Sequence, residues 1–178
     1  FELIIINDAS TDGSAKIVEQ CKYEMDYIKD INLEKNMGVA YVRNLGVSLA
    51  RGEYVCFIDS DDVIERNFIE LMYKTALKYN SDIVCCNYYY IDEKNRKTKN
   101  VFSRRQGNYS AKKLIHSLLK DTSMHFFLWN KMFRRRMVED NRVLFTNRCF
   151  EDILFTMKMF YFSDKIYIIN IPLYNYRK

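Results

Sequence analysis

The first half of the chain alternates short, continuous apolar runs with segments of helical period. Continuous apolar runs of strand length are typical of strands buried on both faces of a sheet. The alternation predicts an α/β domain with a largely parallel sheet. The predicted strands are Phe1–Asn7, Tyr27–Leu33, Tyr54–Ile58 and Asp82–Ile91, and the helices between them are Ser14–Met25, Val39–Ala50 and Glu65–Tyr79.

The second half is less regular. A loop or hairpin turn is predicted over Asp92–Asn100, and His125–Phe133 is rich in aromatic residues without a clear period. No repeat, low-complexity tract or linker interrupts the 178 residues, so a single domain is the simplest interpretation. The remaining predicted elements are helices over Ser110–Lys120 and Glu151–Phe162 and short strands over Lys165–Asn170 and Leu173–Tyr176.

Composition narrows the class of protein. A hydrophobic fraction of 48% and a charged fraction of 29% exclude a disordered, collagen-like or disulfide-stapled chain. No apolar stretch reaches the ~18 residues of a membrane span. The expectation of a cytoplasmic protein comes from the cysteines, which fit free thiols in a reducing compartment. The net charge of +5 allows contact with a phosphate-bearing substrate or with anionic lipid at the inner face of the membrane. No element that reads nucleic acid is recognisable, and no nucleic-acid partner is expected.

The five cysteines do not form a metal or disulfide pattern. Their number is odd, no CxxC pair occurs, and neither histidine stands at a zinc-ligand spacing from a cysteine. Cys56 and Cys85 lie inside apolar runs. We therefore expect free thiols in the core of a protein from a reducing compartment.

Acidic residues follow two of the predicted strands. Asp8 comes after LIIIN, and Asp59, Asp61 and Asp62 come after YVCFI. In open α/β sheets, ligands bind beyond the carboxyl ends of the strands. Crowded carboxylates repel one another, and Mg²⁺ or Mn²⁺ relieves that repulsion. The structural alternative is that these acids only form turns and cap the helices that follow.

Three motifs in order point to a known family. IINDASTDGS is followed by EKNMGVAYVRNLGVSLARGEYVCFIDSDD, and later come LWNKMFRRRMV, FEDILFTMKMF and IPLYNYRK. This series resembles the inverting GT-A glycosyltransferases of bacterial family 2. The resemblance implies a GT-A fold, which is Rossmann-like with a mostly parallel central sheet. It also implies one domain, with residues 1–91 as the nucleotide-sugar-binding half and residues 92–178 as the acceptor-side half.

The resemblance also indicates a fragment. The family's first strand, with its "P-x-Y-N" type loop, is expected before Phe1, and the family's usual continuation is expected after Lys178. The sequence departs from the family at Asn7-Asp8-Ala9, where Asp-Asp-Gly is usual. Asp8 matches the second acid, and the role of the first acid is left open.

The resemblance assigns roles to five residues. Asp8 matches the acid that accepts a hydrogen bond from the nucleotide base, and Arg43 matches a basic residue near the nucleotide. Asp59 matches the first acid of the DxD motif, near ribose and metal, and Asp61 matches the direct metal ligand. Asp152 matches the catalytic base. From the residues alone, Arg43 is equally well a surface residue and Asp152 a helix-start acid.

Four neighbouring residues have weaker assignments. Glu151 is expected to help position the base, and Asp62 to cap the helix that follows. Trp129 and Lys131 match a "W-N-K" segment near the acceptor, although a tryptophan buried in the core is an equal alternative.

The implied reaction is metal-dependent transfer of a sugar, with inversion. The donor is a nucleoside diphosphate sugar, with UDP expected, and the acceptor is a hydroxyl of a polysaccharide or lipid-linked glycan. Two alternatives stay open. A nucleotidyltransferase would typically show a basic Gly-rich loop after the first strand. A receiver-like or sugar-nucleotide-binding module would leave Glu151-Asp152 without a role.

Overall fold

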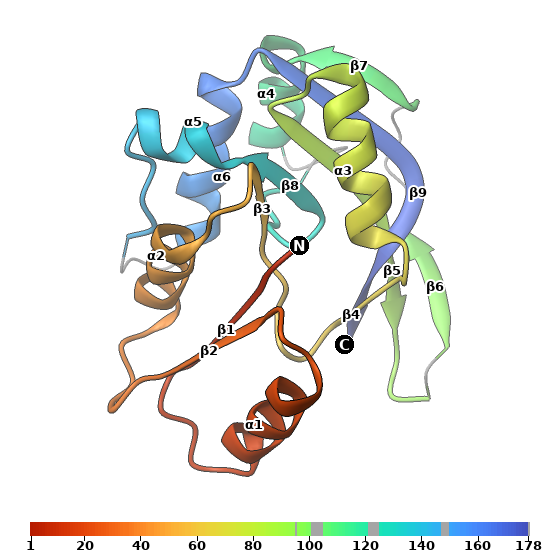
Figure 1. The fold of residues 1–178 in the computed structure, drawn as a ribbon. Coiled ribbons are helices and arrows are strands. Elements are labelled where there is room, and N and C mark those ends of the chain that lie inside the picture. Colours follow the sequence, from red (N-terminus) through yellow and green to blue (C-terminus); the bar gives the residue numbers. More distant parts are fainter. Residues whose placement is uncertain (95, 101–104, 121–124, 147–149, 178) are drawn as a thin grey trace. The chain divides into compact units, whose positions relative to one another are not determined.

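The computed structural model of residues 1–178 (Figure 1) describes residues 1–94, 96–100, 105–120, 125–146 and 150–177. The chain forms two compact units, of which unit 1 comprises Phe1–Glu53 and Leu144–Glu151. Unit 2 comprises Tyr54–Val143 and Asp152–Lys178. The boundary near residue 53 differs from the division at residue 91 in the sequence analysis. The assignment of donor and acceptor halves stays a prediction.

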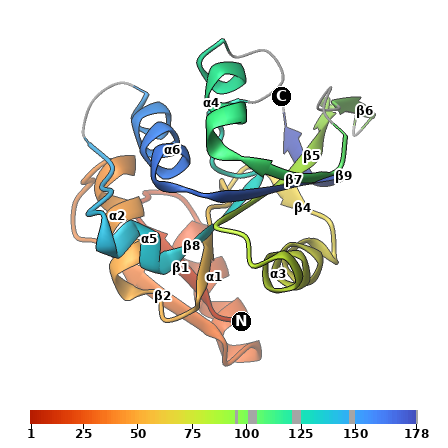
Figure 2. The same ribbon diagram turned by 90° about the horizontal axis from the view of Figure 1, so that it is seen from above.

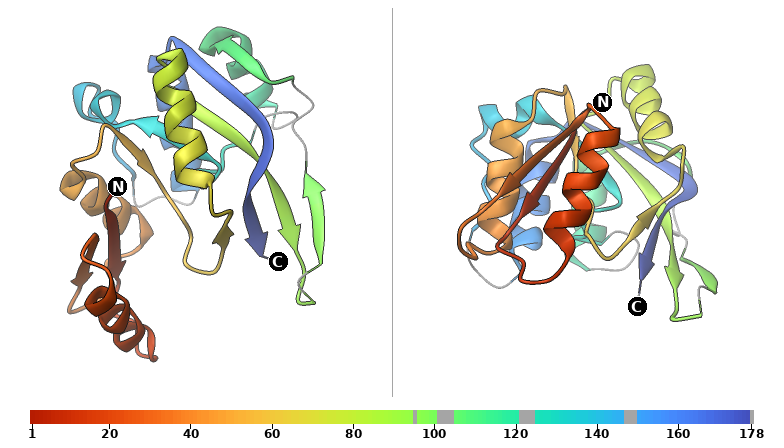
Figure 3. Two further views of the ribbon diagram at one scale, coloured as in Figure 1. Left: turned by 45° about the vertical axis from the view of Figure 1, so that its right-hand side comes forward. Right: turned by 60° about the horizontal axis from the view of Figure 1, so that its bottom comes forward.

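Unit 1 is built on two parallel strands. β1 (Leu3–Asn7) pairs with β2 (Ile28–Asn32) in a register that sets Leu3 opposite Ile28. The crossover between parallel strands needs a dozen or more residues, and α1 (Ser14–Glu24) supplies it. α2 (Val39–Leu49) follows β2, and the right panel of Figure 3 shows both helices beside the strand pair.

The sheet of unit 2 is mixed. Its described strands follow the order β3-β8-β5-β9-β4, with β6 on β5 and β7 on β9. Among these pairings β5–β9 is parallel and the others are antiparallel. The expected mostly parallel sheet is thus corrected, because the second half of the chain returns as antiparallel partners. The strands are β3 (Tyr54–Cys56), β4 (Val63–Ile64), β5 (Ile83–Ile91), β6 (Lys97–Asn100), β7 (Gly107–Ser110), β8 (Lys131–Arg134) and β9 (Lys165–Arg177).

Helices cover both faces of this sheet. Figure 2 shows α3 (Phe68–Tyr79) on one side, with α4 (Ala111–Leu119) and α6 (Glu151–Phe162) on the other. The short α5 (Arg135–Asp140) continues directly from β8. α3 ends at Asn80, whose left-handed backbone (φ 46°) stops the helix. None of the described helices is long and apolar enough to cross a membrane.

β9 is one strand where two were predicted. It runs beside β5, as the left panel of Figure 3 shows. The register shifts on either side of Asn87, which pairs with Pro172. Proline has no N–H to give to the ladder and is tolerated at such an irregularity. The gap predicted between the strands Lys165–Asn170 and Leu173–Tyr176 is therefore an irregularity inside one continuous strand.

The core of unit 2 contains free thiols, as expected. Cys56 and Cys85 are both free cysteines. Burial raises the pKa of Cys85 to about 11 and that of Cys56 to about 12, so neither is a thiolate at neutral pH. Cys149 lies outside the described residues.

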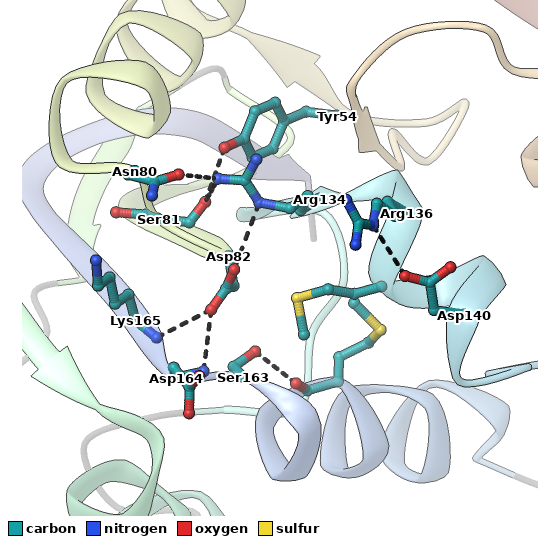
Figure 4. A network of polar contacts seen from close by, with 12 residues as sticks. Tyr54, Asn80, Ser81, Asp82, Arg134, Arg136, Asp140, Ser163, Asp164 and Lys165 are labelled. Atoms are coloured by element: carbon teal, nitrogen blue, oxygen red, sulfur yellow. Dashed lines mark hydrogen bonds and ion pairs between the residues drawn. The ribbon is translucent and has the colours of Figure 1, made fainter.

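A polar network holds the amino-terminal ends of β5 and β9 together (Figure 4). Asp82 accepts hydrogen bonds from the backbone N–H groups of Asp164 and Lys165, both at 3.0 Å. Its other oxygen lies 3.4 Å from Nε of Arg134. Arg134 also donates to Asn80 Oδ1 (2.8 Å) and stands over the ring of Tyr54. This acid is thus bound to an arginine and to backbone donors.

Candidate functional site

The DSDD segment forms a tight turn between β3 and β4. The backbone N–H of Asp62 donates to the carbonyl oxygen of Asp59 at 3.1 Å, which closes a four-residue turn. Asp61, near the apex, is exposed, whereas Asp59 and Asp62 are half-buried. Two of the predicted site residues, Asp59 and Asp61, therefore lie in one turn of unit 2.

Asp62 is bound to the end of β9. Its carboxylate accepts a hydrogen bond from the hydroxyl of Tyr174 (2.8 Å) and another from the backbone N–H of Arg177 (2.8 Å). Burial raises the pKa of Asp62, and the negative charges of Asp61 and Asp59 raise it further. The expected helix cap is wrong, because α3 begins only at Phe68. Asp62 attaches the turn to the sheet.

The turn offers two carboxylates to a divalent cation. In the described part of the chain, no group of three or more His, Cys, Asp or Glu side chains could hold a metal. Both oxygens of Asp62 accept hydrogen bonds within the protein, so the carboxylates considered for a cation are those of Asp59 and Asp61. Mg²⁺ is commonly bound by one or two carboxylates completed by substrate phosphates. The mutual repulsion of these acids also favours a cation, so this donor set fits the predicted metal.

In unit 1, Asp8 organises the start of α2. Its two carboxylate oxygens accept hydrogen bonds from the backbone N–H groups of Met37 (2.7 Å) and Gly38 (2.9 Å). Asn36 donates to the carbonyl oxygen of Asp8 at 3.4 Å, in keeping with the shaping of this loop. The role of Asp8 toward a nucleotide base stays a prediction.

Asn7 and Ala9, which differ from the residues usual in the family, have well-defined local roles or conformations in the structure. The side-chain oxygen of Asn7 accepts a hydrogen bond from the backbone N–H of Ser10 (2.9 Å), and its amide donates to Asn32 (2.9 Å). Ala9 has a φ of 59°, a left-handed conformation that is strained for a residue with a Cβ. Glycine adopts this conformation without strain, which gives a physical reason for the family's glycine at this position.

Arg43 is half-buried and paired within unit 1. Its Nη1 lies 2.5 Å from Oε1 of Glu151, and the two side chains are 16% and 18% exposed. Its guanidinium also stands over the ring of Phe145, 5.7 Å from the centroid. The description of Arg43 as a simple surface residue is therefore wrong. Its contact with a nucleotide stays a prediction.

Asp152 occupies the first turn of α6, in unit 2. One of its carboxylate oxygens accepts a hydrogen bond from the backbone N–H of Ile153 at 2.9 Å. Phe150, which immediately precedes α6, has a φ of 62°, so the backbone turns sharply just before the helix begins. This placement is compatible both with an acid that only stabilises the start of the helix and with a catalytic base. The catalytic role of Asp152 therefore stays a prediction.

Trp129 belongs to the core. It is 5% exposed and stacks on Phe127 (4.7 Å between centroids) and on Tyr174 (4.6 Å). The interplanar angles of these contacts are 13° and 20°. A third stacked contact, with Tyr176, lies at 5.4 Å. The core interpretation is confirmed, since the ring packs face to face with other aromatic rings.

Lys131 is fully buried, which the sequence did not reveal. Its ammonium group donates to the carbonyl oxygens of His125 (2.8 Å) and Phe127 (2.5 Å) and to Oδ1 of Asn130 (2.9 Å). Three oxygen acceptors compensate the loss of water around the charge. Lys131 therefore binds the aromatic segment to β8.

Tyr174 is the residue of this site that sequence reasoning missed. It accepts a hydrogen bond from the backbone N–H of Asp59 (3.2 Å) and donates to Asp62. The available signal was the alternation of Tyr174 and Tyr176 in a strand, which puts both rings on one face. That pattern does not reveal which loop a hydroxyl reaches.

Comparison with known proteins gives related sequences of named activity. The chain is 35% identical over 178 residues to the cholesterol galactosyltransferase of Borreliella burgdorferi, covering 95% of this chain and 49% of that protein. It is 33% identical over 174 residues to the poly(ribitol-phosphate) beta-N-acetylglucosaminyltransferase TarP of Staphylococcus aureus, covering 95% and 50%. The chain thus spans about half the length of these curated relatives.

A solved structure confirms the expected GT-A fold. The crystal structure of S. aureus TarS 1-349 in complex with UDP-GlcNAc superposes with a TM-score of 0.82 at 25% identity. The match covers the whole of this chain and 50% of that one. The family model described as Glycosyl transferase family 2 matches residues 1–142. With the motifs, the fold and the family match in agreement, the chain belongs to glycosyl transferase family 2.

Proposed function

We propose that this chain forms the donor-binding and catalytic part of an inverting glycosyltransferase. It transfers a sugar from a nucleoside diphosphate sugar, with UDP as the nucleotide, to an acceptor hydroxyl. The observation that carries the proposal is the family match over residues 1–142 together with the likeness to TarS bound to UDP-GlcNAc.

The donor end of the reaction is assigned to Asp8, Arg43, Asp59 and Asp61. Asp8 accepts a hydrogen bond from the base, and Arg43 lies near the nucleotide. Asp59 and Asp61 hold the divalent cation, Mn²⁺ or Mg²⁺. When bound there, the cation supplies positive charge beside the departing diphosphate. The exposure of Asp61 supports this assignment, because the side chain is open to a ligand from solvent.

The acceptor end of the reaction is assigned to Asp152. Its carboxylate takes the proton of the acceptor hydroxyl while the oxygen attacks the anomeric carbon. Attack opposite to the departing diphosphate inverts the configuration. Its place in the first turn of α6 supports the assignment, because the start of a helix favours a negatively charged side chain.

The acceptor class proposed is a polysaccharide or lipid-linked glycan, made in the cytoplasm at the inner face of the membrane. TarP, whose name states transfer to poly(ribitol-phosphate), and the galactosyltransferase for cholesterol are both relatives. The net charge of +5 is compatible with peripheral association with anionic lipid.

The test is a panel of UDP-, GDP- and dTDP-sugars, scored by thermal shift of the intact protein with Mn²⁺. A ligand that binds the native state raises the unfolding temperature in proportion to the logarithm of its concentration over Kd. UDP-sugars should give the largest shift, and excess EDTA should abolish most of it. Stabilisation by none of the donors would contradict the proposal. Donor binding without release of UDP, with glycan acceptors present, would support a binding module instead.

A further inference from the structure

The hydroxyl of Tyr174 joins the two ends of the Asp59–Asp62 turn. It accepts from the backbone N–H of Asp59 at 3.2 Å and donates to the carboxylate of Asp62 at 2.8 Å. The turn also has its internal bond, from the N–H of Asp62 to the carbonyl oxygen of Asp59 (3.1 Å). One side chain of β9 thus contacts both the first and the last residue of the turn.

The ring of Tyr174 is held rigidly behind that hydroxyl. It is fully buried, stacks on Trp129 and meets the ring of Phe68 edge-on at 6.2 Å. A buried aromatic ring packed on two sides has little freedom to follow a moving loop. The hydroxyl therefore presents a fixed point to which the turn is attached.

The contacts described for the neighbouring tyrosines involve other partners. In the register of β5 and β9, Tyr88 lies opposite Tyr174 and Tyr90 lies opposite Tyr176. The hydroxyls of Tyr88 and Tyr90 lie 3.2 Å from each other. The contacts described for Tyr176 are ring contacts, with Trp129 and Tyr90. The chain therefore offers a matched control, in which a tyrosine of the same strand and aromatic cluster loses its hydroxyl.

The attachment decides where Asp61 lies. Asp61 is the exposed residue next to Asp62, and a four-residue turn requires its first and last residues to stay close together. If Asp59 and Asp62 separate, the backbone that sets the spacing between the carboxylates of Asp59 and Asp61 changes. Partners that orient metal ligands without touching the metal typically contribute about 10–100-fold to metal affinity.

We propose that Tyr174 is a positioning residue of the donor site, which holds Asp59 and Asp61 in the arrangement that binds the metal-diphosphate unit of the donor. The proposal rests on the proposed function, because it assumes that this turn binds a nucleotide with a divalent cation.

The experiment measures the affinity of the intact protein for UDP by calorimetry, once with Mn²⁺ and once with excess EDTA. Tyr174→Phe keeps the packed ring and removes both hydrogen bonds, and Tyr176→Phe is the control. We expect Tyr174→Phe to weaken binding about tenfold in Mn²⁺, at the lower end of the range for such partners, and to change it little in EDTA. Raising the Mn²⁺ concentration should restore most of the lost affinity. Tyr176→Phe should bind as the wild type does.

The second variant is Asp62→Asn, which changes the acceptor of the hydrogen bond from the Tyr174 hydroxyl. Because Tyr174 and Asp62 share this hydrogen bond, the double variant should weaken UDP binding less than the product of the two single effects. A role in stability alone would lower the unfolding temperature and leave the ratio of affinities in Mn²⁺ and EDTA unchanged.

Three results overturn the proposal, and they differ from one another. If Tyr174→Phe binds UDP with wild-type affinity in Mn²⁺, the positioning role is wrong and the proposed function stands. If Tyr174→Phe and Tyr176→Phe weaken binding equally, the effect is not specific to the hydroxyl of Tyr174 and the positioning role is wrong. If the wild type binds no UDP with either Mn²⁺ or Mg²⁺, the proposed function fails and this inference fails with it.

Discussion

The two ends of β9 hold acidic side chains in different surroundings. At the amino-terminal end, Asp82 is bound to Arg134 and to two backbone N–H groups. At the carboxyl-terminal end, the described partners of Asp62 are a hydroxyl and a backbone N–H, and its neighbours are further acids. The first arrangement compensates the carboxylate charge within the protein, and the second leaves negative charge that an external cation can balance.

The difference separates a structural acid from one suited to ligand binding. An acid paired with an arginine contributes to the fold and has little left to offer a ligand. A group of acids held by neutral donors costs stability through repulsion, and binding of a cation removes this cost. The comparison therefore predicts opposite responses to substitution at the two ends of the strand.

The largest effect is expected at Asp152, the acid of α6 that is proposed to act in the chemical step. Asp152→Asn keeps the size of the side chain and cannot take a proton. The transfer rate should fall about 10²–10⁴-fold, as for other positioned general bases. Donor affinity should stay within a few fold, because a base acts in the transition state. The measurement is the transfer rate with an identified acceptor beside the UDP-sugar affinity. A variant with wild-type transfer would show that Asp152 is only a helix-start acid.

The next effect is expected at the uncompensated end. Asp61→Asn removes a charged metal ligand, so the affinity for UDP-sugar in Mn²⁺ should fall at least about 100-fold, the upper end of the range for partners outside the metal shell. The free energy of unfolding should stay the same or rise, because one repulsive charge is gone. Calorimetry and urea unfolding measure the two quantities. Equal affinity in the variant, or equal wild-type affinity in excess EDTA, would contradict the metal assignment.

The compensated end should respond in stability instead. Asp82→Ala removes the carboxylate partner of Arg134 and the acceptor of two backbone N–H groups, and should lower the free energy of unfolding by about 2 kcal/mol. Affinity for UDP should not change in the folded variant. Asp140→Asn, which breaks an exposed i,i+4 pair with Arg136, is the control and should cost less than about 0.5 kcal/mol. An unchanged stability in Asp82→Ala would break the comparison.

The smallest effect concerns Glu65, a compensated acid close to the turn. Hydrogen bonds from Lys97 and Asn175 lower the pKa of Glu65. A lowered pKa in the folded state contributes stability above the ordinary carboxyl pKa, and this contribution is lost as the pH falls through the lowered value. The stability advantage of the wild type over Glu65→Gln should thus be about a few tenths of a kcal/mol at neutral pH, since the side chain is 35% exposed and water screens its charge. It should vanish in acid. An advantage that grows as the pH falls would contradict this assignment.

Local patterns predicted the elements whose signal lies within one segment. The apolar runs of β1, β2, β3 and β5 and the periodic segments of α1, α2, α3 and α6 were recognised, with ends shifted by a few residues. β4 has only two residues, and β8 lies in an aromatic segment without a period. Strand direction was not recoverable, because antiparallel pairing of β5 with β8 depends on contacts between distant segments.

The site was predictable in its residue types and not in its contacts. The spacing of Asp59 and Asp61 and their place after a strand indicated a ligand site. That Asp62 would face Tyr174 depends on how β4 pairs with β9. The buried ammonium of Lys131 was hidden for a similar reason, since three oxygens that the sequence does not mark as acceptors surround it.

The attachment of the Asp59–Asp62 turn to β9 has a consequence for biosynthesis. Asp59 and Tyr174 are 115 residues apart in the chain. At a synthesis rate of about 5–20 residues per second, the ribosome makes the turn roughly ten seconds before the strand that fixes its shape. During that interval the central strand β5 lacks its parallel partner β9, so apolar residues of β5 stay exposed to solvent. We therefore expect the nascent chain to depend on chaperones until β9 leaves the exit tunnel, and the ability to bind a nucleotide to arise only after β9 has emerged.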